Sequence, residues 1–139
     1  MTSTTVRIDN PSSLHKPAGY SHVAQVSGGR LIYIAGQVAQ DVSGTLVGRD
    51  DFRAQLQQIF ANLNAALASA GASFNDVIKL NYFCCEQVPA TDLPVVREIR
   101  DRFVNTSSPP ISTFVFVSRL VRPEWLVEVE AVAALNPPA

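Results

Sequence analysis

Two glutamates, Glu128 and Glu130, stand in the alternating segment 127–133 (VEVEAVA) close to the C-terminus. Successive side chains of a β-strand point to opposite faces, so this spacing places both carboxylates on one face, roughly 7 Å apart by strand rise. A carboxylate in a partly dry cleft can have a raised pKa and exchange protons with a bound water. The alternative is structural: both glutamates form salt bridges between subunits, with Arg119 or Arg122 as partners.

Other chemistry-bearing residues do not form a recognisable centre. Cys84 and Cys85 are adjacent in a predicted strand, where their side chains point to opposite faces and a bridge between them would be strained. Together with His15 and His22 they do not match metal-ligand spacing, so we predict no metal and two reduced core thiols. A Ser–His–Asp triad is not supported, because no motif connects these histidines to Ser112.

The elements that must position these residues follow from hydrophobic patterning. β-branched and aromatic runs predict strands, and apolar residues at helical spacing predict two helices. The segments at 20–26 and 31–35 are predicted to pair as a hairpin, whose Gly28-Gly29 tip supplies the positive φ angles of a tight turn. We therefore expect one α+β domain over residues 1–139 with the order β-β-β-α-β-α-β-β. The predicted strands are 6–8, 20–26, 31–35, 77–85, 109–117 and 126–133, and the predicted helices are 51–70, closed by Gly71, and 92–104, with Asp92 as N-cap.

Composition limits the partners. The chain has 139 residues, 47% of them hydrophobic and 17% charged, with a formal net charge of −1, which argues against nucleic acid as a partner. Arg97, Arg100 and Arg102 cluster, but Glu98 and Asp101 alternate with them at i,i+4 spacing, as on an ordinary solvated helix. The predicted inward stripe of this helix consists of Leu93, Val96, Ile99, Arg100 and Phe103. No membrane-spanning run and no signal peptide is present, so we expect a cytoplasmic protein that does not bind membranes.

Three blocks of the sequence, in order, resemble the Rid (YjgF-type, RidA-like) family. The segments 109–117 and 126–133 resemble its closing signature, and 58–67 with 70–79 resembles its first helix and following strand. Gly19-Tyr20-Ser21 and 33–37 (YIAGQ) resemble its N-terminal elements. The resemblance spans about residues 17–134. It implies a chorismate-mutase-like fold, a mixed twisted sheet with two helices on one face. It also implies a homotrimer that binds small molecules in inter-subunit clefts without a cofactor.

The best-known members of this family are imine and enamine deaminases, in which a glutamate of the last strand positions the hydrolytic water. Glu128 matches that residue and is the predicted catalytic residue. The family binds a substrate carboxylate through an arginine, and Ser112 occupies its position. A serine hydroxyl cannot replace the bidentate contact, and losing about 1.5–3 kcal/mol would weaken binding roughly 10- to 100-fold.

At three other positions the chain differs from the family pattern, and each difference makes the predicted cleft more apolar. Ala35 stands where the family has a serine, Phe114 where it usually has a cysteine, and Val96 where it often has an asparagine. The predicted ligand-binding residues are Tyr20, Gly36, Gln37, Ser112, Thr113 and Phe114.

The resemblance therefore implies hydrolysis or tautomerisation of an imine, enamine or related conjugated carbonyl. The alternative is a ligand-binding trimer without catalysis. The ribonuclease activity often attached to the family is disfavoured by the near-neutral charge and the lack of a basic, aromatic groove.

Overall fold

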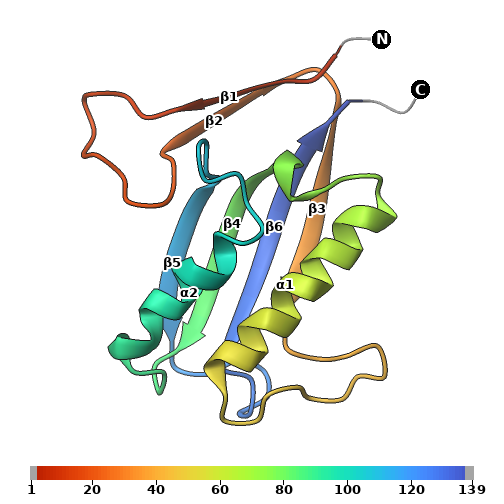
Figure 1. Ribbon diagram of the computed structural model, residues 1–139, viewed down its shortest axis with the longest axis vertical. Coiled ribbons are helices and arrows are strands. Elements are labelled where there is room, and N and C mark those ends of the chain that lie inside the picture. Colours follow the sequence, from red (N-terminus) through yellow and green to blue (C-terminus); the bar gives the residue numbers. More distant parts are fainter. Residues whose placement is uncertain (1–2, 137–139) are drawn as a thin grey trace.

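The computed structural model describes residues 3–136 and has two layers, helices on one side and a sheet on the other (Figure 1). The strands are β1 (Thr5–Asp9), β2 (Val23–Ser27), β3 (Arg30–Gln37), β4 (Val77–Cys85), β5 (Ile111–Val117) and β6 (Val127–Leu135). The helices are α1 (Phe52–Ser69) and α2 (Leu93–Arg100), with short 3-10 turns at Phe74–Asp76 and Ala90–Asp92. This order confirms the predicted α+β class.

The main sheet has the strand order β3-β6-β4-β5. β6 runs antiparallel to both of its neighbours, whereas β4 and β5 are parallel, so the sheet is mixed as predicted. A parallel pair needs a crossover connection, and α2 provides it. Both helices cover one face of this sheet. The opposite face, here called the open face, carries no helix from residues 3–136 (Figure 1).

The predicted hairpin between the second and third strands is wrong. β2 pairs with β1 in a separate two-stranded sheet, whereas β3 pairs with β6. The tight turn itself exists, with φ +72° at Gly28 and +70° at Gly29. A Cβ at Gly29 would overlap the Thr4 hydroxyl and the Leu135 carbonyl, so the chain is already crowded where the two strands part.

Helix α1 forms where the periodicity predicted it. Asp51 caps its first turn by accepting a hydrogen bond from the Ala54 amide at 3.0 Å, and Gly71 follows its end with φ +77°. Its buried stripe packs on β6 and β3, and it consists of Phe52, Gln55, Leu56, Ile59, Phe60, Leu63 and Leu67.

One member of that stripe, Gln55, is polar and fully buried. Its amide nitrogen donates to the Gly48 and Glu124 carbonyls, both at 3.0 Å, and its oxygen accepts from the Leu126 amide at 2.9 Å. Because Leu126 directly precedes β6, this side chain fixes the entry of the strand that carries both glutamates.

Helix α2 is shorter than predicted and ends at Arg100, with turns replacing its expected continuation to residue 104. Asp92 stands at the N-cap position, but its side chain makes no capping hydrogen bond, because a 3-10 turn precedes the helix. Arg97 pairs with Asp101 and Arg102 with Glu98, as predicted for a solvated face. Arg100 follows its place in the predicted inward stripe rather than in the solvated cluster, because its side chain is only 11% exposed.

Cys84 and Cys85 are both buried and free, as predicted. Burial raises the pKa of Cys84 to about 12, with a smaller contribution from Cys85. Across residues 3–136 no helix is long and apolar enough to cross a membrane.

Candidate functional site

The alternation of β6 places the two glutamates on the open face. Val127 and Val129 are fully buried against the helices, so Glu128 and Glu130 project to the other side, as the sequence predicted. Both are partly exposed. The pairing register places Phe83 of β4 beside Glu128 and, one strand further, Val115 of β5.

Glu128 lies directly against Gly36 on β3. The Cβ of any other residue at position 36 would overlap Glu128 Oε1 and stand 2.9 Å from its Cγ. The pairing between β3 and β6 shifts register between Ile34 and Gln37, which brings the Gly36 backbone to this carboxylate. Gly36 is therefore required here for close approach, and its φ is not in the left-handed region.

The pKa of Glu128 is raised above its ordinary value. Burial is the larger cause, and the negative charge of Glu130 on the same face adds to it. Phe83 on the neighbouring strand β4 and the Gly36 backbone on β3 flank this carboxylate. Glu128 is thus suited to take up and release a proton nearer neutral pH than an ordinary glutamate.

Glu130 has a different environment. Asn81 of β4 donates a hydrogen bond to Glu130 Oε1 at 3.1 Å, and the Asn81 amide oxygen is buried without a partner in the described chain. Glu130 also lines a cavity of about 200 Å³ on the open face together with Tyr33 and Lys79. This carboxylate is held in place, whereas no such hydrogen bond holds Glu128 within residues 3–136.

The alternative role of Glu128 and Glu130, as salt-bridge partners, has no counterpart within one chain. Among residues 3–136, neither glutamate forms an ion pair. Arg119 donates instead to the Leu120 and Val121 carbonyls, and the Arg122 guanidinium lies 5.6 Å from the centre of the Trp125 ring.

The predicted ligand-binding residues of β5 divide between the two faces of the sheet. Phe114 stacks on buried Tyr82 with ring centroids 5.5 Å apart and packs against the core. Ser112 lies on the same side and pairs with core residue Leu80. Thr113 is on the open face, in the row of Asn81 and Glu130. Within one chain, therefore, only Thr113 of these three shares a face with Glu128.

Tyr20 lies apart from the open face, in the loop before β2. Its hydroxyl is 2.8 Å from His15 Nε2, and the edge of its ring meets His22. The next residue, Ser21, donates its amide to the Pro110 carbonyl at 3.1 Å and forms a bridge with Ile111. This contact brings the Tyr20 loop to the start of β5, near Ser112.

Gly36 and Gln37 border another cavity, of about 410 Å³, between the end of β3 and α1, where Asn62 is a further lining residue. The Gln37 side chain donates to the Ala35 carbonyl at 3.1 Å. In the described chain, this amide thus satisfies a backbone carbonyl near the end of β3.

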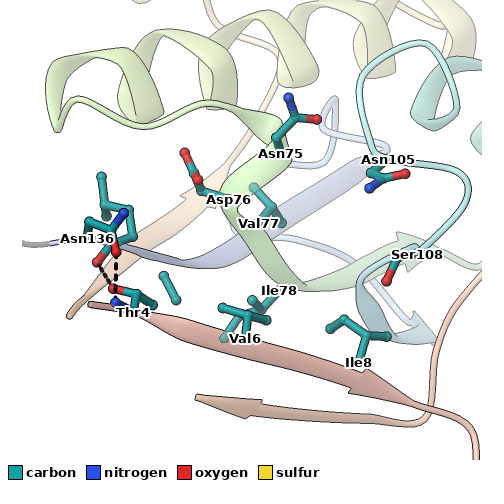
Figure 2. Close-up of a pocket in the computed structure, with 12 residues that line it drawn as sticks. Thr4, Val6, Ile8, Asn75, Asp76, Val77, Ile78, Asn105, Ser108 and Asn136 are labelled. Carbon is teal, nitrogen blue, oxygen red and sulfur yellow. Dashed lines mark hydrogen bonds between the residues drawn. The ribbon is translucent and has the colours of Figure 1, made fainter. Parts of the chain in front are cut away.

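A further cavity of about 290 Å³ lies between β1 and the start of β4 and is lined by none of the predicted site residues (Figure 2). Its rim is polar, with Asn75, Asp76 and Asn105 among the lining residues. Thr4 closes one end by hydrogen bonds to Asn136 and to the Leu135 carbonyl. These bonds attach the start of β1 to the end of β6, so the polar residues at this end of the cavity have a structural role.

Two residues near these sites were missed as functional candidates. Asn81 lies within the predicted strand 77–85, and only the pairing register of β4 with β6 places it opposite Glu130. Arg100 was assigned to the solvated arginine cluster, although it also belonged to the predicted inward stripe of α2. That conflict between an inward position and a charged side chain was the available signal.

Comparison with known proteins agrees with this arrangement. A family model described as Endoribonuclease L-PSP matches residues 11–135. A RutC family protein of Pyrococcus abyssi is 33% identical over 119 residues, 85% of this chain and 88% of that protein. A 2-iminobutanoate/2-iminopropanoate deaminase of Dermatophagoides farinae is 30% identical over 122 residues, 87% of this chain and 90% of that protein.

Among solved structures, the Rid family protein YyfB of Yersinia pestis has a TM-score of 0.82 and 34% identity, covering 94% of this chain and 98% of that one. RidA of a Psychrobacter species has a TM-score of 0.66 and 28% identity, covering 92% and 98%. The chain belongs to the Rid (YjgF-type) family, whose members include imine deaminases.

Proposed function

We propose that this protein hydrolyses the imine or enamine form of a small carbonyl compound, with Glu128 as the general acid/base that positions water. The observation that supports this most is the state of the Glu128 carboxyl. It is partly buried beside Phe83 and Gly36, it has a raised pKa, and it forms no ion pair in the described chain. Such a group can receive a proton from water in one step and return it to the leaving amine in another.

The proposed reaction takes place in a cleft between subunits of a homotrimer. Within one chain, Glu128 and Thr113 lie on the open face, whereas Ser112, Phe114 and the Tyr20 loop lie elsewhere. An assembly that covers the open face would bring residues of a second subunit to Glu128, remove water from it and raise its pKa further.

Imine hydrolysis tests this function directly. 2-Imino acids are generated in situ, the surviving imine is trapped with semicarbazide, and wild type is compared with Glu128→Gln. We expect the substitution to reduce the enzymatic rate by about 10²- to 10⁴-fold, the usual contribution of general acid–base catalysis. Glu130→Gln removes the same charge from the same face two residues away, and it should reduce the rate much less than Glu128→Gln, because the Glu130 charge is only the smaller cause of the raised pKa of Glu128. Equal activity of wild type and Glu128→Gln would exclude the proposed role.

The second candidate is ligand binding without catalysis, which the environment of Ser112 and Phe114 favours. No arginine is present at position 112, and the Phe114 ring fills the adjacent space against Tyr82. Ser112→Arg separates the two functions. If wild type already hydrolyses imino acids, the missing arginine is compensated elsewhere. If only Ser112→Arg is active, the natural ligand is not an amino-acid imine. Inactivity of both favours the binding protein.

A further inference from the structure

Both histidines of the chain meet in the loop between β1 and β2 (Figure 1). His15 and His22 are seven residues apart in sequence, and their ring centres lie 4.7 Å apart with the ring planes at 89°. Histidine is the commonest metal ligand among side chains, and imidazole suits zinc, copper and nickel ions. Two imidazoles so close together, outside the site around Glu128, therefore invite comparison with metal sites.

The hydrogen bonds of His22 leave one of its ring nitrogens available. Its Nε2 lies 2.8 Å from the His15 carbonyl oxygen, and because a carbonyl can only accept, Nε2 carries the hydrogen. In the neutral ring Nδ1 is then unprotonated, and it has no hydrogen-bond partner among residues 3–136. Metal-ligating histidines have this arrangement, in which the outer ring N–H donates to a carbonyl or carboxylate and fixes the tautomer.

His15 is held in the same manner, by a side chain. Its Nε2 lies 2.8 Å from the Tyr20 hydroxyl, which can accept a hydrogen bond as well as donate one. When Nε2 donates, Nδ1 of His15 is also unprotonated, and no hydrogen bond within the described chain occupies it. Each histidine thus has an outer partner on Nε2 and an available Nδ1.

The spacing of the two rings fits a shared ion. With a Zn–N bond of about 2.0–2.1 Å, the centre of a ligating imidazole lies about 3.2 Å from the ion, and two such rings at about 90–110° are about 4.5–5.2 Å apart. The observed separation of 4.7 Å between His15 and His22 lies within that range. Sharing an ion therefore requires rotation of the rings at most, not a change in their separation.

The loop that carries the two rings is already fixed in place. Asn10 Oδ1 accepts a hydrogen bond from the His22 amide at 2.8 Å, and the Ser21 amide donates to the Pro110 carbonyl at 3.1 Å. Gly19 supplies the left-handed backbone, with φ +78°, in the turn between the histidines. A ligand that connects the two ends of this turn therefore loses little binding free energy to ordering the chain.

Water molecules would complete the coordination of such an ion. Spacing along the chain predicted no metal, because it joined these histidines to Cys84 and Cys85. The fold separates the two pairs, since both cysteines are buried and pair with Phe116 and Val117, at the end of β5 away from the histidine loop. Within residues 3–136 no group of three or more histidine, cysteine, aspartate or glutamate side chains could hold a metal. Two nitrogens and water make an open, exchangeable site.

We propose that His15 and His22 bind one divalent ion of the zinc, copper and nickel class through their Nδ1 atoms. The bound ion would connect the two ends of the segment 15–22, which carries Tyr20, and hold that segment in its present conformation. Mg²⁺ would not bind, because it prefers oxygen ligands. The site is separate from Glu128 on the open face, so the proposal stands or fails independently of imine hydrolysis.

Long-range ¹H–¹⁵N spectra of the imidazole rings in untagged, ¹⁵N-labelled protein test the site directly, because the chain has only two histidines. Above the ordinary histidine pKa of about 6.5, His22 should be protonated at Nε2 and not at Nδ1. Zn²⁺ should then shift the Nδ1 signals of both rings, with one ion bound per chain, whereas Mg²⁺ should shift neither. A protonated Nδ1 in His22, or an Nδ1 signal of either ring that excess Zn²⁺ leaves unchanged, would overturn the proposal.

Substitution with calorimetry then tests the two residues. His15→Gln and His22→Gln should each weaken Zn²⁺ binding by at least the roughly 10- to 100-fold that the loss of an outer hydrogen-bond partner costs. Lys16→Gln is the matched control, because it changes an exposed side chain of the same loop and leaves both imidazoles in place. It should not weaken binding. Affinity unchanged in either histidine variant, or reduced as much by Lys16→Gln, would contradict the assignment.

Discussion

At the scale of single residues, the contact between Gly36 and Glu128 connects backbone geometry with chemistry. The carboxylate occupies the space where any other residue would place its Cβ. The sequence contains both residues, but their proximity arises only from the pairing of β3 with β6 and its register shift. The glycine and the candidate catalytic residue therefore form one unit.

Gly36→Ala should displace the Glu128 carboxylate and lower the free energy of unfolding by about 1–3 kcal/mol, the usual cost of overpacking. In a Glu128→Ala background the same change should cost much less, because the overlapping atoms are gone. Urea unfolding of the four proteins gives the coupling energy, expected at about 0.5–3 kcal/mol. Additive effects would show that the two residues do not meet.

The raised pKa of Glu128 has a defined consequence for stability. The folded protein holds a proton on this carboxyl in a pH range where the unfolded chain has lost it, so stability falls as the pH rises through the folded-state pKa. The glutamine of Glu128→Gln does not ionise, so this variant does not share the loss of stability. Its stability relative to wild type should therefore increase from pH 4 to pH 7. Urea midpoints measured across that range provide the test.

Glu98 provides a control, because its pKa is shifted in the opposite direction to that of Glu128. Its pKa is lowered, first by the hydrogen bond from Arg53 and also by the charge of Arg102. Its stabilising effect is present above the ordinary glutamate pKa and is lost on acidification. Glu98→Gln should thus lose stability relative to wild type as the pH rises. The same trend in both variants would mean that the pKa shift of Glu128 has been assigned the wrong sign.

At the scale of elements, Gln55 connects α1 to the start of β6. The sequence does not indicate this structural role, because a glutamine next to an apolar stripe is normally assigned to the solvent face of a helix. In the fold it satisfies two carbonyls and one amide of the chain. The strand that carries Glu128 therefore depends on a polar residue of the helix layer.

Gln55→Leu should lower the free energy of unfolding by about 2–5 kcal/mol, since each buried group left without a partner costs about 1–3 kcal/mol. Gln57→Leu, at an exposed position of the same helix, should change it by no more than about 0.5 kcal/mol. Chemical denaturation measures both. Similar effects of the two substitutions would remove the special role of Gln55.

At the scale of the whole molecule, the open face indicates association. It carries exposed apolar side chains, among them Tyr33, which is 75% exposed, and Leu31, which is 48% exposed. An uncovered sheet face with large apolar residues is typical of an interaction surface. The proposed homotrimer would cover this face and enclose Glu128.

Light scattering should give a particle three times the 15.0 kDa mass of the chain. Tyr33→Lys should shift it toward monomer, because the new charge would be buried at the interface beside Lys79. Val121→Lys, at an 81% exposed position outside the strands, should leave the assembly intact. A wild-type monomer would contradict both the trimer and the inter-subunit cleft.

Local patterns were sufficient for much of the fold. The stripe from Phe52 to Leu67 specified α1, and the alternation around Glu128 specified which face of β6 enters the core, because both depend only on neighbours in sequence. The partner of β2 could not be obtained in this way. A Gly-Gly turn is compatible with a hairpin and with two strands that part, and long-range pairing with β1 and β6 decides between them.

The sequence by itself determined the fold class, the family and the candidate glutamate, because periodicity and motif order survive without coordinates. Only the tertiary structure decided that Ser112 and Glu128 lie on opposite faces of the sheet, that Gly36 accommodates the carboxylate, and that Arg100 is mostly buried and lines one cavity with Phe114. The physical reason is that burial, pKa and hydrogen-bond satisfaction depend on segments distant in sequence, and the sheet register brings those segments together.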